Sequence, residues 1–124
     1  MKEIILYYHV HTDVFHFLKI LEQNLNIEIK EIKENEMHQK MVYLLNLPQF
    51  QENPYIECEH QCTQSLLYFA FMSDKQLDIL LSMLRQAKLP PIPYKAMMTK
   101  PNLEYTFIQL YQEIQKEHEA MTKR

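Results

Sequence analysis

The sequence predicts a small α/β domain with a four-stranded, mostly parallel sheet and covering helices. Strand-like and helix-like segments alternate four times along the chain, an order typical of parallel sheets with helical crossovers. Residues 3–10 and 66–72 are apolar on both faces, which predicts that they form the two central strands. We expect a flavodoxin-like, three-layer arrangement. A ferredoxin-like α+β arrangement with an extra helix is the alternative.

The chain of 124 residues is long enough for one domain with an apolar core and too short for two, so we expect residues 1–124 to form a single domain. A net charge of -3 gives no electrostatic reason to expect a nucleic-acid partner. No apolar run approaches the ~20 residues that cross a bilayer, so no membrane partner is expected. The lack of a signal-peptide pattern and the two cysteines predict a cytoplasmic protein with reduced thiols.

The N-terminal half is expected to hold two strands and two helices. Thr12 is placed to cap a helix that ends near Asn26, because asparagine takes the left-handed conformation that often follows a helix. Residues 27–33 alternate imperfectly and carry charge, which predicts an edge strand. Residues 37–47 predict a short helix ended by a proline, and a long polar loop follows.

The C-terminal half is expected to add two strands and two helices. Ser73 and Gln76 form a capping-box pattern after the central strand. Prolines end that helix, and residues 92–98 predict a fourth strand that Pro93 keeps near an edge. A final helix is expected to begin at Asn102 or Thr106. No repeat is evident in the sequence.

The absence of glycine excludes several classes of chemistry. Phosphate-binding loops need glycine for positive φ and close backbone approach, so the P-loop and the dinucleotide fingerprint are both missing. The glycine-flanked nucleophile elbow is missing for the same reason. We therefore expect no cofactor, and we favour a non-enzymatic protein.

The segment His9-Val10-His11-Thr12 suggests a metal site, because residues two apart on a strand point the same way. These four residues resemble the first motif of the polymerase-and-histidinol-phosphatase family of metal-dependent phosphoesterases. That family builds its site in a barrel about twice the length of this chain. We expect no metal here. A small metal-dependent hydrolase using His9, His11 and Asp13 is the alternative function.

Three further metal ligands are available in the segment Cys58–Cys62, namely the two cysteines and His60. His38 would complete a tetrahedral set. Structural zinc usually uses a Cys-x-x-Cys pair together with a second pair, and this chain has neither. Two free thiols in a polar loop is the preferred interpretation, and zinc binding is left open.

The preferred binding site comprises Lys95, Thr99 and Asn102. In open α/β sheets, ligands bind beyond the carboxyl ends of the strands, and these residues follow such an end. Lys95 would supply a cation, and Thr99 and Asn102 would supply hydrogen bonds near a helix N-terminus. A purely structural interpretation is favoured over this site: Lys95 is an edge-strand residue whose apolar stem is covered while its charged end reaches water, and Thr99 and Asn102 are turn and cap residues.

Residues 71–121 resemble a family of small bacterial proteins from Gram-positive anaerobes, classified only as a domain of unknown function. The resemblance rests on Ser73-Asp74-Lys75-Gln76-Leu77, on Pro90-Pro91-Ile92-Pro93 and on Lys95-Ala96 with Thr99. The start of the chain and residues 43–50 also fit the pattern. Asn26 and the Cys58–Cys62 segment depart from it. The resemblance implies a compact cytoplasmic α/β domain and implies no activity.

Residues 98–114 are also similar to the Lys-Pro turn and last helix of response-regulator receiver domains, and the order of strands and helices is similar. Receivers hold magnesium with an acidic pair after the first strand, where this chain has His9 and His11. The resemblance therefore implies a receiver-like fold without receiver chemistry.

We expect a cytoplasmic binding or regulatory module that binds an unknown protein or a small anionic ligand. A homodimer through the C-terminal helix is a further expectation, because Tyr105, Ile108 and Met121 lie off the main apolar stripe of that helix.

Overall fold

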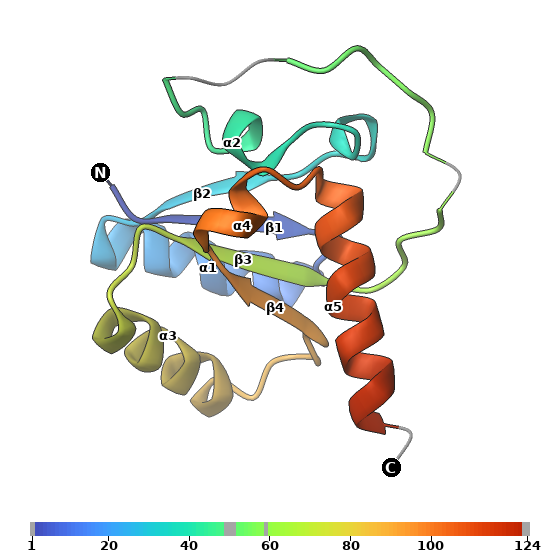
Figure 1. The fold of residues 1–124 in the computed structure, drawn as a ribbon. Coiled ribbons are helices and arrows are strands. Elements are labelled where there is room, and N and C mark those ends of the chain that lie inside the picture. Colours follow the sequence, from blue (N-terminus) through green and yellow to red (C-terminus); the bar gives the residue numbers. More distant parts are fainter. Residues whose placement is uncertain (1, 49–51, 59, 123–124) are drawn as a thin grey trace.

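The computed structural model describes residues 2–48, 52–58 and 60–122, and places helices on both faces of one sheet (Figure 1). The strands are β1 (Ile4–Tyr8), β2 (Glu28–Glu31), β3 (Leu66–Ala70) and β4 (Tyr94–Met97), in the spatial order β2-β1-β3-β4. β1 pairs with β2, and β3 with β4, in parallel, whereas the central β1–β3 pair is antiparallel. The predicted small α/β fold with a four-stranded, mostly parallel sheet is confirmed.

Burial explains this strand order. All five residues of β3 are buried, and three of the five in β1, whereas no residue of β2 is buried. The most apolar strands therefore occupy the centre, and the charged β2 and the proline-flanked β4 form the edges, as predicted.

The helices divide between the two faces of the sheet. Helices α1 (Thr12–Leu25) and α3 (Asp74–Gln86) pack on one face, over a core that includes Ile5, Leu18, Leu67 and Leu80. The 3-10 turn η1 (Glu34–Glu36) and helices α2 (Met41–Leu44), α4 (Lys100–Leu103) and α5 (Phe107–Thr122) lie on the other face. Figure 1 shows the sheet between these two layers.

Several helix ends follow the sequence-based predictions. Asn26 has φ 55° after α1, and Ser73 accepts a hydrogen bond from the Gln76 amide while Gln76 bonds back to the Ser73 amide. The N-cap of α1 is His11, one residue before the predicted Thr12, because the His11 Nδ1 accepts from the Asp13 amide.

Two predicted helices differ from the observed ones. The helix expected over residues 37–47 is a single turn, α2, preceded by the separate turn η1. The final helix is divided into α4 and α5, and Thr106 begins α5 because its hydroxyl accepts from the Gln109 amide at 3.2 Å. Asn102 therefore lies within α4 and does not start the final helix.

The structure contains a repeat that the sequence hides. β1, α1 and β2 are matched in order by β3, α3 and β4, and three residues separate strand from helix in both halves. The residue after the first strand of each half is left-handed, with φ 55° at His9 and 62° at Phe71. The equivalent helices α1 and α3 lie together on one face of the sheet. The equivalent turns η1 and α4 lie together on the other face, as do the equivalent helices α2 and α5.

The equivalence extends to individual hydrogen bonds. The Ile32 amide donates to the Tyr7 carbonyl at 2.8 Å, and Met98 donates to Phe69 at 2.8 Å. Two residues separate the second strand of each half from a short turn, η1 or α4. In each turn the side chain of the third residue accepts a hydrogen bond from the backbone amide of the residue before the turn. Residues 3–45 and 65–111 are therefore two copies of one structural unit.

The copies differ beyond the first turn of their last helices. α2 has 4 residues and leads into residues 46–65, which we call the linker loop, whereas its counterpart α5 continues for 16 residues. The described part of the second half contains no counterpart of the linker loop.

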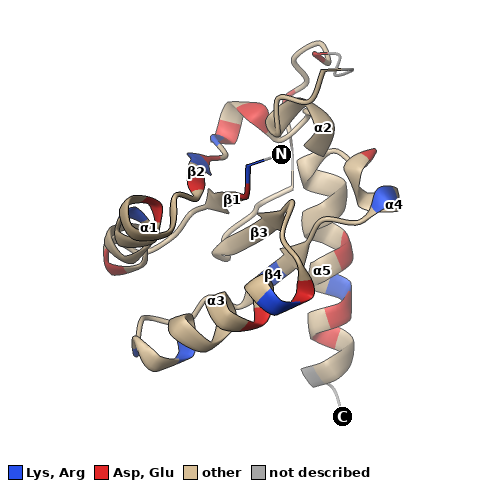
Figure 2. Cartoon of the chain, turned by 90° about the vertical axis from the view of Figure 1, so that its left-hand side faces the viewer, with Lys and Arg blue, Asp and Glu red and all other residues tan. Residues whose placement is uncertain are grey.

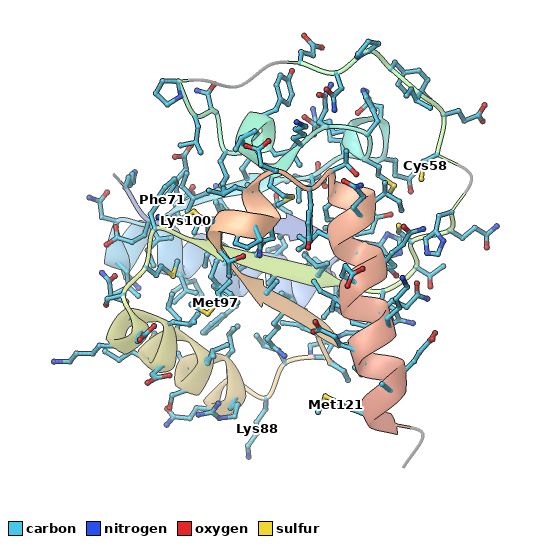
Figure 3. All side chains as sticks on the ribbon, in the orientation of Figure 1. Cys58, Phe71, Lys88, Met97, Lys100 and Met121 are labelled. Carbon is cyan, nitrogen blue, oxygen red and sulfur yellow. The ribbon has the colours of Figure 1, made fainter. Side chains whose placement is uncertain are left out.

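The surface carries mixed charges. Figure 2 shows acidic and basic residues interspersed along α3 and α5 on the face in view. Within the described residues, no helix is both long and apolar enough to cross a membrane. Tyr105 and Ile108 pack against the core, whereas Met121, near the C-terminal end of α5, is 71% exposed (Figure 3).

Candidate functional site

Thr99 and Asn102, two of the predicted binding residues, are brought together as the cap of α4. The Asn102 Oδ1 accepts from the Tyr68 hydroxyl at 2.7 Å and from the Thr99 amide at 3.0 Å. The Asn102 Nδ2 donates to the Met97 carbonyl at 3.0 Å, and the Thr99 hydroxyl accepts from the Asn102 amide. These polar groups are engaged within the protein, as expected for cap residues.

Lys95, the third predicted binding residue, lies on the other side of the sheet. It pairs with Leu67, whose side chain belongs to the core under α1 and α3, whereas Tyr68 faces the opposite core. The Lys95 Nζ donates to the Ile92 carbonyl at 2.8 Å, and desolvation lowers its pKa below the ordinary value. The structure therefore does not bring Lys95 together with Thr99 and Asn102.

The antiparallel centre of the sheet also removes the crevice on which the predicted binding site was based. The carboxyl ends of β3 and β4 lie at one end of the sheet, and those of β1 and β2 at the other. In parallel α/β sheets, ligands bind in a crevice between the carboxyl ends of two strands whose crossovers run in opposite directions. No such crevice forms at β4.

His9 and His11 do not continue β1. The strand ends at Tyr8, His9 is left-handed, and His11 uses its Nδ1 to cap α1. The equivalent Phe71 is also left-handed, so this conformation belongs to the strand–helix turn and gives no sign of a special role for His9. Among the described residues, no three His, Cys, Asp or Glu side chains are grouped as metal ligands would be.

Cys58, His60 and Cys62 have separate partners. The Cys58 thiol is 3.7 Å from the His60 carbonyl oxygen, and the His60 Nε2 is 3.1 Å from the Gln115 Oε1. Both cysteines are free, and Figure 3 shows Cys58 on the linker loop beside α5. Burial, and secondarily Cys58, raises the pKa of the Cys62 thiol to about 12, so this thiol is protonated at neutral pH.

The linker loop is held near its start by Gln39, which is the buried polar side chain among the described residues of the core. The Asn53 amide donates to the Gln39 Oε1 at 2.8 Å, and the Gln39 Nε2 donates to the Asn53 carbonyl at 3.1 Å. The Asn53 side chain donates to the His38 carbonyl at 2.9 Å. Gln39 thus pairs with the loop backbone much as a neighbouring strand would.

The loop is held again at its end. The Tyr8 hydroxyl donates to the Cys62 carbonyl at 2.8 Å, and the Gln64 amide donates to the Tyr111 hydroxyl at 2.9 Å. The His60 ring also packs edge-on against Tyr111. These contacts fix the loop against both β1 and α5.

A pocket of about 590 Å³ lies between the linker loop, the end of β1 and the turn η1, and we call it the loop pocket. Its described lining contains two carboxylates and no lysine or arginine. Aromatic and sulfur-containing side chains complete it. The lining residues are Tyr8, His9, Glu34, Asn35, Met37, Tyr55, Glu57, Cys58, His60, Gln61, Cys62 and Thr63.

A second, more open hollow adjoins the loop pocket at His9. It has a volume of about 850 Å³ and lies at the carboxyl ends of β1 and β2, with Tyr7, Phe15 and Glu31 among its lining residues. His11 and Thr12 reach this hollow from the start of α1. His9 borders both spaces.

The second half of the chain corresponds to a known family. Residues 66–121 match the family model described as Domain of unknown function (DUF3783). The resemblance to a family of unknown function is confirmed over this segment. No curated protein and no solved structure matches the chain.

The DUF3783 segment begins at the first residue of β3 and ends within α5, so it coincides with the second structural unit. Every described residue that lines the loop pocket precedes this segment. The pocket is therefore built outside the part of the chain that matches the family.

Sequence reasoning identified the Cys58–Cys62 segment but not Glu34, Asn35 or Tyr55 as parts of one site. The sequence shows only that the polar loop contains the apolar pair Tyr55-Ile56. The contact with η1 depends on anchoring at Gln39, a residue whose burial its local sequence does not indicate.

Proposed function

We propose that the protein is a non-enzymatic binding module whose loop pocket takes a small organic cation, such as an amine or a quaternary ammonium group. The observation that supports this is the composition of the pocket, which has two carboxylates, tyrosine rings and no described lysine or arginine. Comparison of the two halves supports the choice of this site, because the linker loop has no counterpart in the described part of the second half.

The charge of the pocket favours a cation. Glu34 approaches from η1 and Glu57 from the linker loop, so the two carboxylates come from separate elements on the pocket wall. A cation placed near two carboxylates gains more electrostatic attraction than one placed near a single carboxylate.

Tyrosine rings supply a complementary contact. The Tyr55 side chain is 67% exposed on the pocket wall, and its ring stands edge-on to His38 at a centroid distance of 5.2 Å. Tyr8 also lines the pocket, but it is 2% exposed and its ring packs within the core, so Tyr55 is the ring that offers a face to a cation. A cation held over a tyrosine face gains about 0.5–1 kcal/mol at an exposed site and more when desolvated.

We place the protein in the cytoplasm as part of the same proposal. Two free thiols support this location, because cysteines in oxidising compartments are usually paired. No specific observation favours the alternative of a metal-dependent hydrolase at His9 and His11.

The test is a thermal-shift and calorimetric titration of the purified protein with tetramethylammonium, with 1,4-diaminobutane and with acetate as the anionic comparison. A bound ligand at about one hundred times its Kd stabilises the folded protein by ~2.7 kcal/mol. We expect stabilisation by at least one cation and none by acetate.

Matched variants locate the effect. The double variant Glu34→Gln/Glu57→Gln is expected to lose the cation response. The control, Asp78→Asn/Glu117→Gln, removes the same charge from exposed positions on α3 and α5 and is expected to keep it. Absence of any cation response in the wild type, or an equal response in both double variants, would refute the site.

A further inference from the structure

The surface between the two halves of the chain is nearly two-fold symmetric. The Met41 amide donates to the Tyr105 carbonyl at 2.8 Å, and the Phe107 amide donates to the Gln39 carbonyl at 2.9 Å. Met41 and Phe107 occupy the same position in their respective halves, as first residues of α2 and α5. Each half thus donates and accepts an equivalent hydrogen bond, and this reciprocity defines an isologous interface.

The antiparallel β1–β3 pair continues this symmetry through the sheet. Its register places Leu6 opposite Tyr68 at the centre, and these are the middle residues of the two strands. Lys40 and Thr106 form an isolated antiparallel bridge between the halves on the α5 side. Each of these pairs joins one position of the unit to the same position in the other copy.

We infer that the second half, from β3 to α5, is a self-complementary unit whose fitting partner is a second copy of itself, and that the first half of this chain occupies the place of that copy. In such a pair β3 aligns antiparallel with β3 of the partner. Tyr68 then stands opposite Tyr68, and Thr106 opposite Thr106.

The interface backbone needs no change for this pairing. The backbone hydrogen bonds that cross between the halves join amides to carbonyls, and these groups are present in every copy of the unit. Two side-chain contacts that also cross, from Gln76 to Glu3 and from Lys40 to Glu104, are absent from such a pair because Glu3 and Lys40 belong to the first half. No charged residue lies within either central strand. A second copy therefore brings no like charges together along the central ladder.

Side-chain volume is also compatible. On the α5 face, Leu6 and Tyr8 of β1 correspond to Tyr68 and Ala70 of β3. When Tyr68 and Ala70 replace Leu6 and Tyr8, the larger residue moves from the second position to the first. The net change in side-chain volume is that of replacing one Leu by one Ala. Where β1 is replaced, the larger Phe107 takes the position of Met41, which offsets part of that lost volume.

The family match is consistent with a unit of this size. The segment that matches the DUF3783 model covers β3 to α5 and excludes the first half. A chain with only this unit would expose one side of β3, whose five residues are all buried here. Pairing with a second copy covers that edge.

The test starts from the intact chain with a protease recognition site inserted after Ile56, a residue that is 66% exposed on the linker loop. Cys58 and Cys62 are replaced by Ser and Ala, and Thr106→Cys is added as the reporter. Far-ultraviolet circular dichroism before and after cleavage establishes that the cut protein keeps its fold. Mild urea then allows the halves to exchange, and the urea is removed before oxidation.

We expect oxidation to link two second halves through Thr106→Cys after cleavage and exchange, and native mass spectrometry to show pairs of second halves. Lys116→Cys, an exposed position on the outer side of α5, is the control. The Thr106→Cys product should form on the order of tenfold faster, because pairing raises the effective concentration of the thiols. In the uncut chain, Lys40→Cys/Thr106→Cys is the positive control, since a disulfide within one molecule reports the existing bridge.

Three outcomes would overturn the inference. The first is that the halves re-form only mixed pairs of one first and one second half. The second is that the released second half stays monomeric or aggregates. The third is that the Thr106→Cys disulfide forms no faster than the Lys116→Cys disulfide. None of these outcomes depends on ligand binding, so the loop-pocket proposal stands or fails separately.

Discussion

Substitution of Gln39 by leucine should release the linker loop while leaving the sheet intact. Leucine has nearly the same size as glutamine, so the core around residue 39 stays filled. The Asn53 amide and carbonyl lose their partners, which were at 2.8 and 3.1 Å. The change therefore removes two of the three hydrogen bonds that hold Asn53, and it leaves the bond from the Asn53 side chain to the His38 carbonyl.

The magnitude follows from those two bonds. A hydrogen bond within a protein contributes about 0.5–1.5 kcal/mol net, so two give about 1–3 kcal/mol. Asn53 is half-buried, and solvent can replace part of what Gln39 supplies once the loop moves. We therefore expect the loss in global stability near the lower end, with a larger local effect at the loop.

Two measurements check this prediction. Urea unfolding gives the global change in free energy, and hydrogen exchange at the Asn53 amide gives the local one. Gln23→Leu, at an exposed position on α1, is the control for the added apolar surface. Unchanged exchange at Asn53, with a global change no larger than in the Gln23 variant, would show that Gln39 does not hold the loop. The same variant should weaken cation binding in the loop pocket.

Further predictions concern the thiols, the predicted anion site, metal content and association. Stability should fall as the pH rises from 9 toward 12, because the folded-state pKa of Cys62, about 12, exceeds the ordinary value of 9.0 and the thiol ionises first in the unfolded chain. Urea unfolding midpoints of the wild type and of Cys62→Ala across this pH range test the prediction. The fall should be shallower in the variant. If Lys95 binds small anions, phosphate should raise the melting temperature of the wild type more than that of Lys95→Ala, and equal shifts would remove the site. Elemental analysis of protein purified without an affinity tag should find substoichiometric zinc, manganese and iron, whereas a stoichiometric metal lost in His9→Ala/His11→Ala would revive the hydrolase alternative. A homodimer through α5 predicts twice the monomer mass in light scattering at micromolar concentration, and Met121→Glu should split it without lowering the melting temperature, because this side chain is 71% exposed.

Local physical chemistry made much of the fold predictable. The uniformly apolar stretch of β3 requires burial on both faces, so its central position follows from its residues. Ser73 and Gln76 satisfy each other's backbone amides within one turn, and Asn26 adopts the left-handed conformation by its own preference. Each of these features depends on residues close together in the chain.

The role of Thr99 and Asn102 could be predicted only in part from the sequence. Their types and spacing fit both a ligand site and a cap. The sequence-based prediction favoured the cap, and named these residues as the candidate binding surface if the protein has one. The Tyr68 hydroxyl, 34 positions away from Asn102 in the chain, donates to the Asn102 side chain and joins it to the core. A contact between residues so far apart has no signature in the local sequence.

Tertiary structure alone decided the direction of the central pair, the repeat and the loop pocket. Whether β3 runs parallel or antiparallel to β1 depends on the path of the long linker loop between them, and the apolar pattern of both strands allows either. The repeat was hidden because equivalent positions, such as His11 and Ser73 at the two N-caps, keep their geometry with different side chains. Hydrogen bonds between backbone groups specify that geometry, and since every residue other than proline carries the same amide and carbonyl, the sequence can diverge while the paired architecture persists.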